Sequence, residues 1–502
     1  MTARQVALAA LLALERSGDN RFLKEILGDP ESGYQELTSR DRSLCRELAY
    51  GSVRHRRTLR HLLASRSHAP RSRQDRRTRN ALLLGAYQLL FLSGIKTHAA
   101  VSETVSLVPG KKRRGFLNAV LRAVVRLRGE ILEKPPQDIP SARLLPLREG
   151  RLLSLNEPVL PDWHDADPQS LGITFSYPDV LVNRWLKTYG TQKTLGILAA
   201  ANEVPPICLR VHESRVAAEE VVARLRTAGY APSAVPGLAQ ALLLPAGVSP
   251  ERLPGFQEGL MSVQDATAQE VAELLGAAPG ERLLDLCAAP GGKALVMGEA
   301  VGASGMVCCR DLTASRLQLV REAFSRVKLE ARLELVPGDV LAERFGADGG
   351  GEASYDRVLV DVPCSNTGVL RRRVEARWRA AGLDLNALAQ KQLALLSAGA
   401  QVVKPQGVLV YSTCSIEEEE NRGVVMAFIA ANPQFELLQE LGRRRLWCGL
   451  AQGVTSSPSL ILSLSKDQPD PGTQPAPLPL ATRDVADGRE RATGNRAQDP
   501  VC

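Results

Sequence analysis

The sequence predicts a multidomain protein that combines an all-α bundle, a small α+β subdomain and an α/β domain built on an open, mainly parallel sheet. Three observations lead to this fold class. Apolar residues recur at helical spacing through about the first 130 residues, with no β-rich segment between them. Strand and helix patterns alternate from about residue 265 to 435. The length of 502 residues fits about three domains of roughly 150 residues each.

The bundle is predicted over residues 1–132, and it carries two basic clusters. Its helical segments are "RQVALAALLALER", "RSLCRELAYGSVRH", "RNALLLGAYQLLFL" and "RRGFLNAVLRAVVRL". Between Arg54 and Arg79 there are ten arginines and one acid, Asp75, and the run Lys111–Arg114 follows. A solvated helix face with a basic loop would account for one such cluster. Two clusters in one region favour a polyanionic partner, because each neutralised phosphate releases counterions.

The remaining domains follow from breaks in periodicity. Residues 133–170 are predicted as a linker, because "EKPPQDIP" and "NEPVLPDW" interrupt every regular pattern. Residues 171–260 mix helical and strand-like segments and predict the α+β subdomain. The α/β domain is predicted over 261–440, with strands in "RLLDLC", "MVCCRD", "LELVPGD", "RVLVDVP" and "GVLVYS". Residues 441–502 are expected to form an atypical tail, which turns rich in Pro, Ser, Asp, Gln and Gly from Gly453 onward and predicts disorder.

The composition bounds the class of protein. It is 44% hydrophobic and 24% charged, as in soluble globular proteins, and the formal charge is +8. The N-terminus has the pattern of an amphipathic helix and shows no cleavage site, and the most apolar run, 81–92, is shorter than a membrane span. Nine cysteines include no CxxC or CxxH pair. These features predict a cytoplasmic protein with reduced thiols and no structural metal.

A glycine-containing loop follows the first strand of the α/β domain. In "LLDLCAAPGGKA", Leu283–Leu286 is strand-like, and a helix begins after the two glycines. The loop is neither a Walker loop nor a GxGxxG motif, but its glycines and helix N-terminus suit a nucleotide-like ligand with an anionic end. Asp311 ends the next strand, 26 residues after Asp285, where an acid suits a ribose diol. Asp339 ends the third strand and could meet an adenine amino group.

Two thiols follow neighbouring strands of the same predicted sheet. Cys364 stands in "VLVDVPCSNTGVL" and Cys414 in "LVYSTCSIEEEEN". A buried, inert cysteine is the ordinary interpretation of a single thiol, and it suits Cys45 and Cys208. Two thiols at one sheet edge, each beside polar residues, favour nucleophiles instead. The four glutamates after Cys414 are expected to begin a helix whose N-terminus they suit electrostatically.

These three motifs resemble those of the Nop/Sun family of S-adenosylmethionine-dependent RNA 5-methylcytosine methyltransferases. The segments "LTSRDRSLCRELAYGSVRHR" and "LNAVLR" are similar to the NusB-like RNA-binding domain, and residues 171–255 resemble the family's RNA-binding subdomain. The combination resembles the RsmB (Sun/Fmu) branch, which methylates small-subunit ribosomal RNA. The resemblance covers roughly residues 1 to 432 and implies a NusB-like bundle and a Rossmann-like methyltransferase domain.

The resemblance also implies residue roles and partners. Cys414 is the expected nucleophile, which adds to carbon 6 of a cytosine; Cys364 assists product release, and Asp361 holds the pyrimidine ring nitrogen or its proton. The expected contacts to S-adenosylmethionine are Cys287, Ala288, Ala289, Pro290, Gly291, Gly292, Lys293, Asp311, Asp339 and Asp361. The expected substrate is 16S ribosomal RNA, and we expect a monomer with no metal and no membrane partner.

One departure from the family pattern and two alternatives remain. Residues 441–502 contain nothing like the Asp-Gly-Phe-Phe segment of the family's closing hairpin, which predicts an incomplete sheet and poor activity. A DNA cytosine-5 methyltransferase would use the Pro-Cys thiol, Cys364, as its nucleophile. A non-enzymatic NusB-like assembly or antitermination factor would bind RNA without using either thiol. The Thr-Cys motif argues against the first alternative, and the intact cofactor loop argues against the second.

Overall fold

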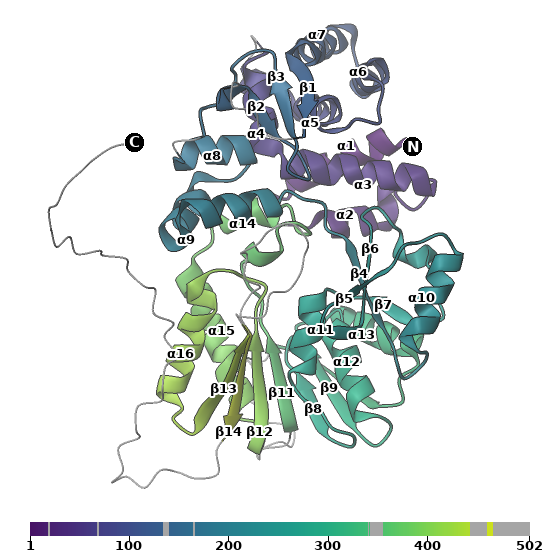
Figure 1. Ribbon diagram of the computed structural model, residues 1–502, viewed down its shortest axis with the longest axis vertical. Coiled ribbons are helices and arrows are strands. Elements are labelled where there is room, and N and C mark those ends of the chain that lie inside the picture. The colour runs from purple at the N-terminus through teal and green to yellow at the C-terminus, as the bar shows by residue number, and fades with distance from the viewer. Residues whose placement is uncertain are drawn as a thin grey trace, which may run out of the picture. The chain divides into compact units, whose positions relative to one another are not determined.

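The computed structural model describes residues 1–18, 21–67, 70–133, 140–163, 166–339, 341, 355–441 and 459–464. Within these residues, the predicted order of domains is confirmed: an α-helical bundle, a small α+β subdomain and an α/β domain (Figure 1). Residues 442–458 and 465–502, which make up most of the predicted tail, lie outside the described residues.

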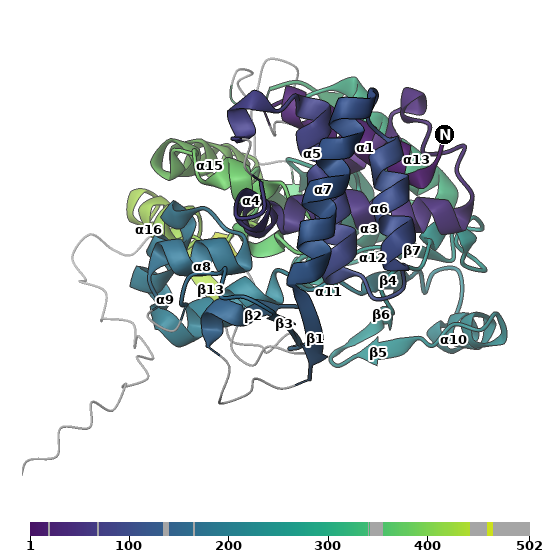
Figure 2. The ribbon, with the colours of Figure 1, turned by 90° about the horizontal axis from the view of Figure 1, so that it is seen from above.

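The N-terminal bundle contains seven α-helices in the described part of the chain. They are α1 (Ala3–Arg16), α2 (Leu23–Gly28), α3 (Ser39–Arg54), α4 (Arg56–Ala64), α5 (Arg76–Phe91), α6 (Thr97–Ser106) and α7 (Lys111–Leu127). Side chains of Thr2, Thr38 and Asp75 cap α1, α3 and α5, so each helix begins where its first free amides are satisfied. Apolar stripes meet in one core that includes Leu8, Leu48 and Leu121. Figure 2 shows α5, α7 and α6 side by side.

The predicted linker region contains regular structure. Strands β1 (Arg128–Leu132), β2 (Leu144–Pro146) and β3 (Leu152–Leu155) form an antiparallel sheet in the order β1-β3-β2. Leu145, Leu153 and Leu155 belong to the core of the bundle. Strands of three to five residues are too short to show a periodicity, so the sequence pattern indicated only an interruption. Helices α8 (Pro168–Phe175) and α9 (Asp179–Ala200) follow.

The small α+β subdomain is an antiparallel sheet with one helix. Its strands are β4 (Ile207–Val211), β5 (Ser233–Val235), β6 (Leu238–Leu244) and β7 (Met261–Val263), in the order β5-β6-β4-β7, with α10 (Ala218–Thr227) between β4 and β5 in sequence. Arg210 of β4 ties this sheet to the α/β domain through ion pairs with Glu273 and Glu299.

The α/β domain is a seven-stranded sheet in the order β10-β9-β8-β11-β12-β14-β13. The strands are β8 (Arg282–Asp285), β9 (Met306–Asp311), β10 (Arg332–Pro337), β11 (Tyr355–Asp361), β12 (Val403–Ser412), β13 (Phe435–Leu441) and β14 (Ser459–Leu464). Strands β8 to β12 pair in parallel. The chain moves outward from β8 to β10 and then returns to the other side of β8 with β11. This reversal is the point where open sheets bind ligands.

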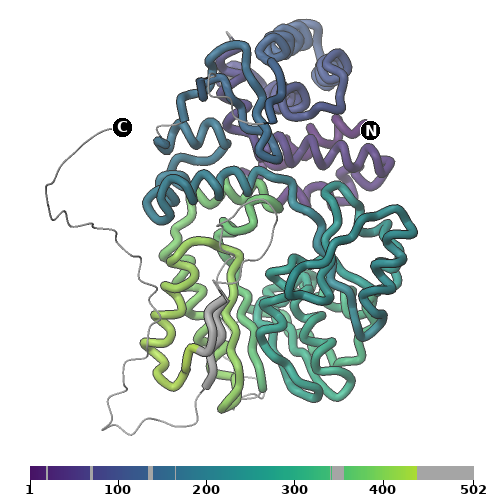
Figure 3. The backbone as a smooth tube through the Cα atoms, in the orientation of Figure 1, coloured from purple at the N-terminus to yellow at the C-terminus, as the bar shows by residue number. Residues whose placement is uncertain are grey.

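Helices cover both faces of this sheet. They are α11 (Ala266–Glu273), α12 (Gly292–Val301), α13 (Ala314–Val327), α15 (Leu385–Ala400) and α16 (Arg422–Ala431). The short helix α14 (Ala376–Ala380) packs instead with α8 and α9. Alternate residues of one strand enter different cores: Leu359 packs with the cluster that contains α12 and α13, and Val358 with the cluster that contains α15 and α16 (Figure 1). The course of β12 into α16 can be followed in Figure 3.

The expected loss of the closing hairpin is wrong. Strand β14 pairs antiparallel with β12, from Val408↔Ser463 to Ser412↔Ser459, and with β13. The sheet is therefore closed by a hairpin although the chain has no Asp-Gly-Phe-Phe segment, because ladder pairing uses backbone groups, which "SLILSL" supplies equally well. The expectation of poor activity, which rested on an incomplete sheet, loses its basis.

Candidate active site

The two predicted thiols meet at the carboxyl ends of β11 and β12. These strands pair in parallel, with Asp361 opposite Ser412, so the residues that follow each strand emerge at the same edge. The Sγ atoms of Cys364 and Cys414 are 2.9 Å apart, and the Cys414 backbone amide donates a hydrogen bond to Cys364 Sγ at 3.3 Å. Both are free cysteines. The structure thus brings together two side chains that are 50 residues apart in sequence.

The environments of the two thiols push their pKa values apart. The hydrogen bond from Cys364 lowers the pKa of Cys414, against the effect of burial, and the positive charge of Arg373 acts in the same direction. The same hydrogen bond, together with burial, raises the pKa of Cys364 well above its usual range. Cys414 is therefore the thiol that ionises first, and Cys364 keeps its proton and can donate it.

Asn366 holds the Cys414 side chain, a role that sequence reasoning missed. The Cys414 thiol donates to Asn366 Oδ1 at 3.2 Å, Arg373 donates to the same oxygen, and Asn366 Nδ2 donates to the Cys364 carbonyl at 2.7 Å. Asn366 has φ = 64°, a left-handed conformation that asparagine tolerates better than most residues. The Ser-Asn pair directly after Pro-Cys is a turn signal that could have directed attention to this residue.

The prediction for the four glutamates is wrong. Residues Glu418–Glu420 form a 3₁₀ turn, and α16 begins at Arg422 with Asn421 as its N-cap. Glu420 is fully buried between the two thiol loops. It accepts hydrogen bonds from the Ser365 amide at 2.8 Å and from the hydroxyls of Ser365 and Ser415. Specific buried donors, rather than a helix N-terminus, therefore account for this glutamate.

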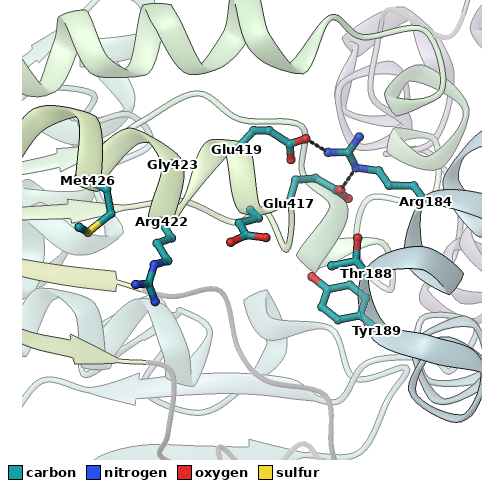
Figure 4. A pocket seen from close by; sticks show the side chains of 9 residues that line it. Arg184, Thr188, Tyr189, Glu417, Glu419, Arg422, Gly423 and Met426 are labelled. Carbon is teal, nitrogen blue, oxygen red and sulfur yellow. Dashed lines mark hydrogen bonds and ion pairs between the residues drawn. The ribbon is translucent and has the colours of Figure 1, made fainter. Parts of the chain in front are cut away.

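The other three glutamates line a cavity beside the thiol loop. The cavity has a volume of about 440 Å³ and lies between α9 and the start of α16. In Figure 4, Arg184 points toward Glu417 and Glu419, with which it forms ion pairs. Glu417 is buried and also accepts a hydrogen bond from Trp185 Nε1 at 3.0 Å. These contacts anchor the loop after Cys414 to α9.

Lys293 and Asp361 lie next to the thiol pair. Lys293 Nζ donates to Asp361 Oδ2 at 2.6 Å, and the Ser412 hydroxyl donates to Asp361 Oδ1 at 2.7 Å. Burial opposes the charge of Lys293, but the Asp361 carboxylate more than offsets this effect, so the pKa of Lys293 is raised. Lys293 stays charged in this position. The pair joins the glycine-containing loop to the end of β11.

The loop 287–293 makes a tight turn that leads into α12. Gly291 has φ = 102°, and a Cβ on it would lie 3.1 Å from the Cα of Val320, so a side chain is excluded there. Ala288 and Gly291 are joined by a backbone hydrogen bond of 2.7 Å that closes the turn. Cys287, Ala289, Pro290 and Gly292 complete the loop, and burial raises the pKa of Cys287, so this thiol stays protonated.

Three aspartates lie at the ends of β8, β9 and β10. Asp311 accepts from the Ala289 amide at 2.9 Å and pairs with Arg316. Asp339 is exposed, and its carboxylate accepts from the Leu341 amide at 3.0 Å. Asp285, which the sequence did not single out as a site residue, is 1% exposed, and its Oδ1 has no hydrogen-bond partner in the described residues. Burial, and then the charge of Asp361, raise the pKa of Asp285 to about 7.

Four of the ten arginines of the first basic cluster form the following contacts within the protein. Arg54 is buried and donates to the Arg371 carbonyl at 3.1 Å. Ion pairs hold three more arginines of this cluster: Arg57 with Asp179, Arg66 with Glu157, and Arg79 with Glu15. These contacts compete with phosphates for the four arginines, whereas Arg73, Arg76 and Arg77 of the same cluster are exposed.

A smaller basic patch remains exposed at the N-termini of α5 and α7. It comprises Arg73, Arg76, Arg77, Lys111, Lys112, Arg113 and Arg114. Arg113 pairs with Asp75, the N-cap of α5, at 3.3 Å and so joins the two helix ends. Exposed cations and helix N-termini both favour anions. We refer to these seven residues as the α5–α7 basic patch.

Two classes of site are not found in the described part of the chain. It contains no group of three or more His, Cys, Asp or Glu side chains that could hold a metal ion. Among the same residues, every helix is too short or too polar to cross a membrane.

Comparison with known proteins assigns each region to a family. Residues 272–454 match the family described as 16S rRNA methyltransferase RsmB/F, residues 1–126 match the NusB family, and residues 177–250 match the RsmF/B-like ferredoxin-like domain. The crystal structure of PH0851 superposes with a TM-score of 0.68 at 20% identity and covers 92% of this chain and 99% of its own. This likeness supports the fold.

Curated relatives extend over most of the chain. The protein is 34% identical over 445 residues to ribosomal RNA small subunit methyltransferase B of Pseudomonas putida. The alignment covers 88% of this chain and 91% of the relative. It is 33% identical over 406 residues to the protein of the same name from Cronobacter sakazakii. That alignment covers 80% of this chain and 85% of the relative. With this identity over most of both chains, the protein belongs to the ribosomal RNA small subunit methyltransferase B family.

Proposed function

We propose that this protein transfers a methyl group from S-adenosylmethionine to carbon 5 of a cytosine in 16S ribosomal RNA, through a covalent adduct with Cys414. One observation carries the proposal: two thiols lie 2.9 Å apart at the ends of adjacent strands, and their pKa values move in opposite directions. A nucleophile with a neighbouring proton donor is what reversible addition to a pyrimidine requires.

The choice of RNA rests on the relatives and on the basic patch. The curated relatives are named for the small ribosomal subunit, and the family match to residues 272–454 is described for 16S rRNA. The bundle matches the NusB family, and its α5–α7 basic patch supplies cations for phosphates. We place the RNA contacts in the bundle and in residues 171–260. The cytoplasmic location and the monomeric state remain predictions.

The residues around the loop fit S-adenosylmethionine. The buried Asp285 Oδ1 has no hydrogen-bond partner among the described residues, so the site offers an unsatisfied acceptor to a ligand. The residues that would hold the cofactor are Cys287, Ala288, Ala289, Pro290, Gly291, Gly292, Lys293, Asp311, Asp339 and Asp361. When bound, the cofactor supplies an electrophilic methyl group on a sulfonium sulfur.

The side chains of this chain perform the remaining steps. The Cys414 thiolate adds to carbon 6 of the cytosine, and the new bond makes carbon 5 nucleophilic. Asp361, held by Lys293 and Ser412, is placed to bind the ring nitrogen or its proton. After methylation, carbon 5 loses its proton to a base, the bond between Cys414 and carbon 6 breaks, and the thiolate returns. Cys364, which shares a proton with Cys414, assists this release.

Single substitutions of the two thiols test the mechanism. Cys414→Ala should lower methylation about a thousandfold or more and abolish the covalent RNA adduct, because no other group supplies the addition. Cys364→Ala should still form the adduct and transfer the methyl group, and then accumulate a protein–RNA complex that survives denaturing electrophoresis. Labelled 16S RNA fragments and S-adenosylmethionine provide the assay.

The same gels separate the alternatives. An adduct with Cys414→Ala and none with Cys364→Ala would assign the nucleophile to Cys364, as in a DNA enzyme, and DNA and RNA substrates tested side by side would then identify the target. Absence of S-adenosylmethionine binding in calorimetry would favour a non-enzymatic RNA-binding factor.

A further inference from the structure

The segment 371–380, which follows the Cys364 loop, contacts the start of α2 in the bundle. Two guanidinium groups lie over the ring of Phe22, with the Cζ atoms of Arg373 and Arg379 at 4.9 Å and 4.0 Å from the ring centroid. The Leu23 amide donates a hydrogen bond of 2.7 Å to Glu375, which is 1% exposed. Because an unpaired buried carboxylate is costly, this bond fixes α2 against the segment.

A second set of contacts holds the same segment at the end of α3. Trp378 Nε1 donates to the Val53 carbonyl at 3.2 Å, and buried Arg377 donates to the Arg54 carbonyl at 3.0 Å. The last carbonyls of a helix lack partners within the helix and attract cations, so these contacts are favourable. The segment is thereby held by two helices of the N-terminal bundle.

The segment also reaches the catalytic thiol. Arg373 donates to Asn366 Oδ1, the atom that accepts the hydrogen bond from Cys414 Sγ at 3.2 Å. The charged and titratable groups that act on Cys414 are Cys364, Arg373, Asp361 and Lys293. Arg373 also contacts the bundle, through the ring of Phe22. A continuous set of contacts therefore joins Phe22, Arg373, Asn366 and Cys414.

We propose that Phe22 of the N-terminal bundle positions Arg373 and, through Asn366, the Cys414 thiol, so that the start of α2 is a component of the methyl-transfer site. Stacking on the ring limits the rotamers of the long Arg373 side chain, which is otherwise exposed. Phe22 and Arg373 are then positioning residues, and the bundle contributes to the chemistry besides binding RNA. This inference rests on the proposed role of Cys414.

The test measures Cys414 directly as well as methylation. Mass spectrometry follows alkylation of Cys414 by iodoacetamide as a function of pH in the full-length protein. Arg373→Gln should slow alkylation at pH 7 about tenfold, because the loss of the cation raises the pKa of Cys414 and so lowers its thiolate fraction. It should lower kcat by a similar factor and leave the KM values for RNA and S-adenosylmethionine within about twofold. Phe22→Ala should act in the same direction, by about threefold.

Two matched variants complete the test. Phe22→Tyr keeps an aromatic ring and should restore both rates. Arg379→Gln removes the other guanidinium from the same ring, and it should leave Cys414 alkylation and kcat unchanged, because the hydrogen bond to Asn366 comes from Arg373. An alkylation profile of Arg373→Gln equal to that of the unsubstituted protein would overturn the proposal. A Phe22→Ala variant with normal alkylation would remove the bundle from it.

The alkylation arm is independent of the proposed function. If Cys414→Ala retained methylation, the assignment of the nucleophile would be wrong. The effect of Phe22 and Arg373 on Cys414 alkylation would still report whether the bundle positions this thiol.

Discussion

Glu420 is the residue on which both thiol loops converge. Its carboxylate accepts from the amide and hydroxyl of Ser365, from the hydroxyl of Ser415 and from Gln392 Nε2 at 3.0 Å. Ser365 directly follows Cys364, and Ser415 directly follows Cys414. We predict that Glu420→Gln destabilises the protein by about 2–4 kcal/mol, because an amide nitrogen then faces donors. Chemical denaturation measures this loss, and kcat should fall with it.

Glu419→Gln is the matched control for that change. Glu419 is partly exposed and pairs with Arg184 at the edge of the cavity. Exposed ion pairs contribute little, so the free energy of unfolding should change by less than about 1 kcal/mol. Equal losses in the two variants would show that Glu420 has no special place among the four glutamates.

Asp285 should make the stability of the folded protein fall as the pH rises. Burial raises its pKa to about 7, whereas in the unfolded chain it has the ordinary value near 4. Between these values the folded state binds a proton that the unfolded state has released, so the free energy of unfolding falls as pH rises from about 4 to 7. Asn cannot ionise, and Asp285→Asn should therefore gain stability relative to the unsubstituted protein over this window, by a few kcal/mol at most.

Asp356 provides a control of opposite sign. Partial burial opposes its charge, but the hydrogen bond from Lys404 lowers its pKa. Its contribution to stability is present above the ordinary aspartate pKa and is lost as pH falls, so Asp356→Asn should be least stable relative to the unsubstituted protein near neutral pH. Thermal melts of both variants from pH 4.5 to 7.5 measure the two slopes. Parallel slopes would contradict the assignment for Asp285.

The sequence indicated the thiols but not the groups that hold them. Cys364 and Cys414 each follow an apolar run at one predicted edge, so their proximity could be inferred from parallel topology. Glu417 and Glu420 are buried because of the 3₁₀ turn at Glu418–Glu420, and no periodicity in the sequence indicates such a turn. The contacts of Asn366 likewise depend on tertiary structure.

At the level of elements, the alternating segments predicted the parallel strands well, and the shortest strands were missed. Strands β8 to β12 are apolar runs bounded by turn residues, which is the strongest sequence signal for a buried parallel sheet. Strand β14 was not expected because the chain lacks the Asp-Gly-Phe-Phe motif, whereas antiparallel pairing needs only backbone groups.

Strand β14 leads to a prediction about the end of the folded unit. Residues Met1–Ser465 form one compact unit, and β14 lies between β12 and β13. A chain that ends after Ser465 should melt at the same temperature as the full chain. A chain that ends after Leu441 loses β14, which pairs with both β12 and β13, and exposes the edge of β12. It should therefore melt several degrees lower, about 5 °C or more, and aggregate on heating. Equal melting temperatures would show that β14 adds no stability.

At the scale of the whole molecule, the structure shows which of the basic side chains are paired and which are exposed. The sequence has ten arginines between Arg54 and Arg79. Four of them form hydrogen bonds or ion pairs within the protein: Arg54, Arg57, Arg66 and Arg79. The exposed cations of the α5–α7 basic patch lie where two helix N-termini meet. The composition predicts a polyanionic partner, but only the packing of the helices locates the surface that could bind it. The sequence alone does not show which arginines are paired and which are exposed.

The last prediction concerns this surface. Arg76→Glu combined with Lys112→Glu reverses two exposed charges of the α5–α7 basic patch. If these residues bind phosphates, RNA affinity should fall, and the slope of log K against log salt should become shallower by about 0.7–0.9 for each phosphate that is no longer neutralised. S-adenosylmethionine affinity and Cys414 alkylation should not change, because the patch lies on a different domain from the thiols. Filter binding at salt concentrations between about 50 and 200 mM would measure the slope.

Arg321→Glu combined with Lys391→Glu makes the same charge change on exposed positions of α13 and α15 and controls for net charge. If both double variants altered the slope equally, the effect would belong to overall charge, and the patch would not be the RNA-binding surface.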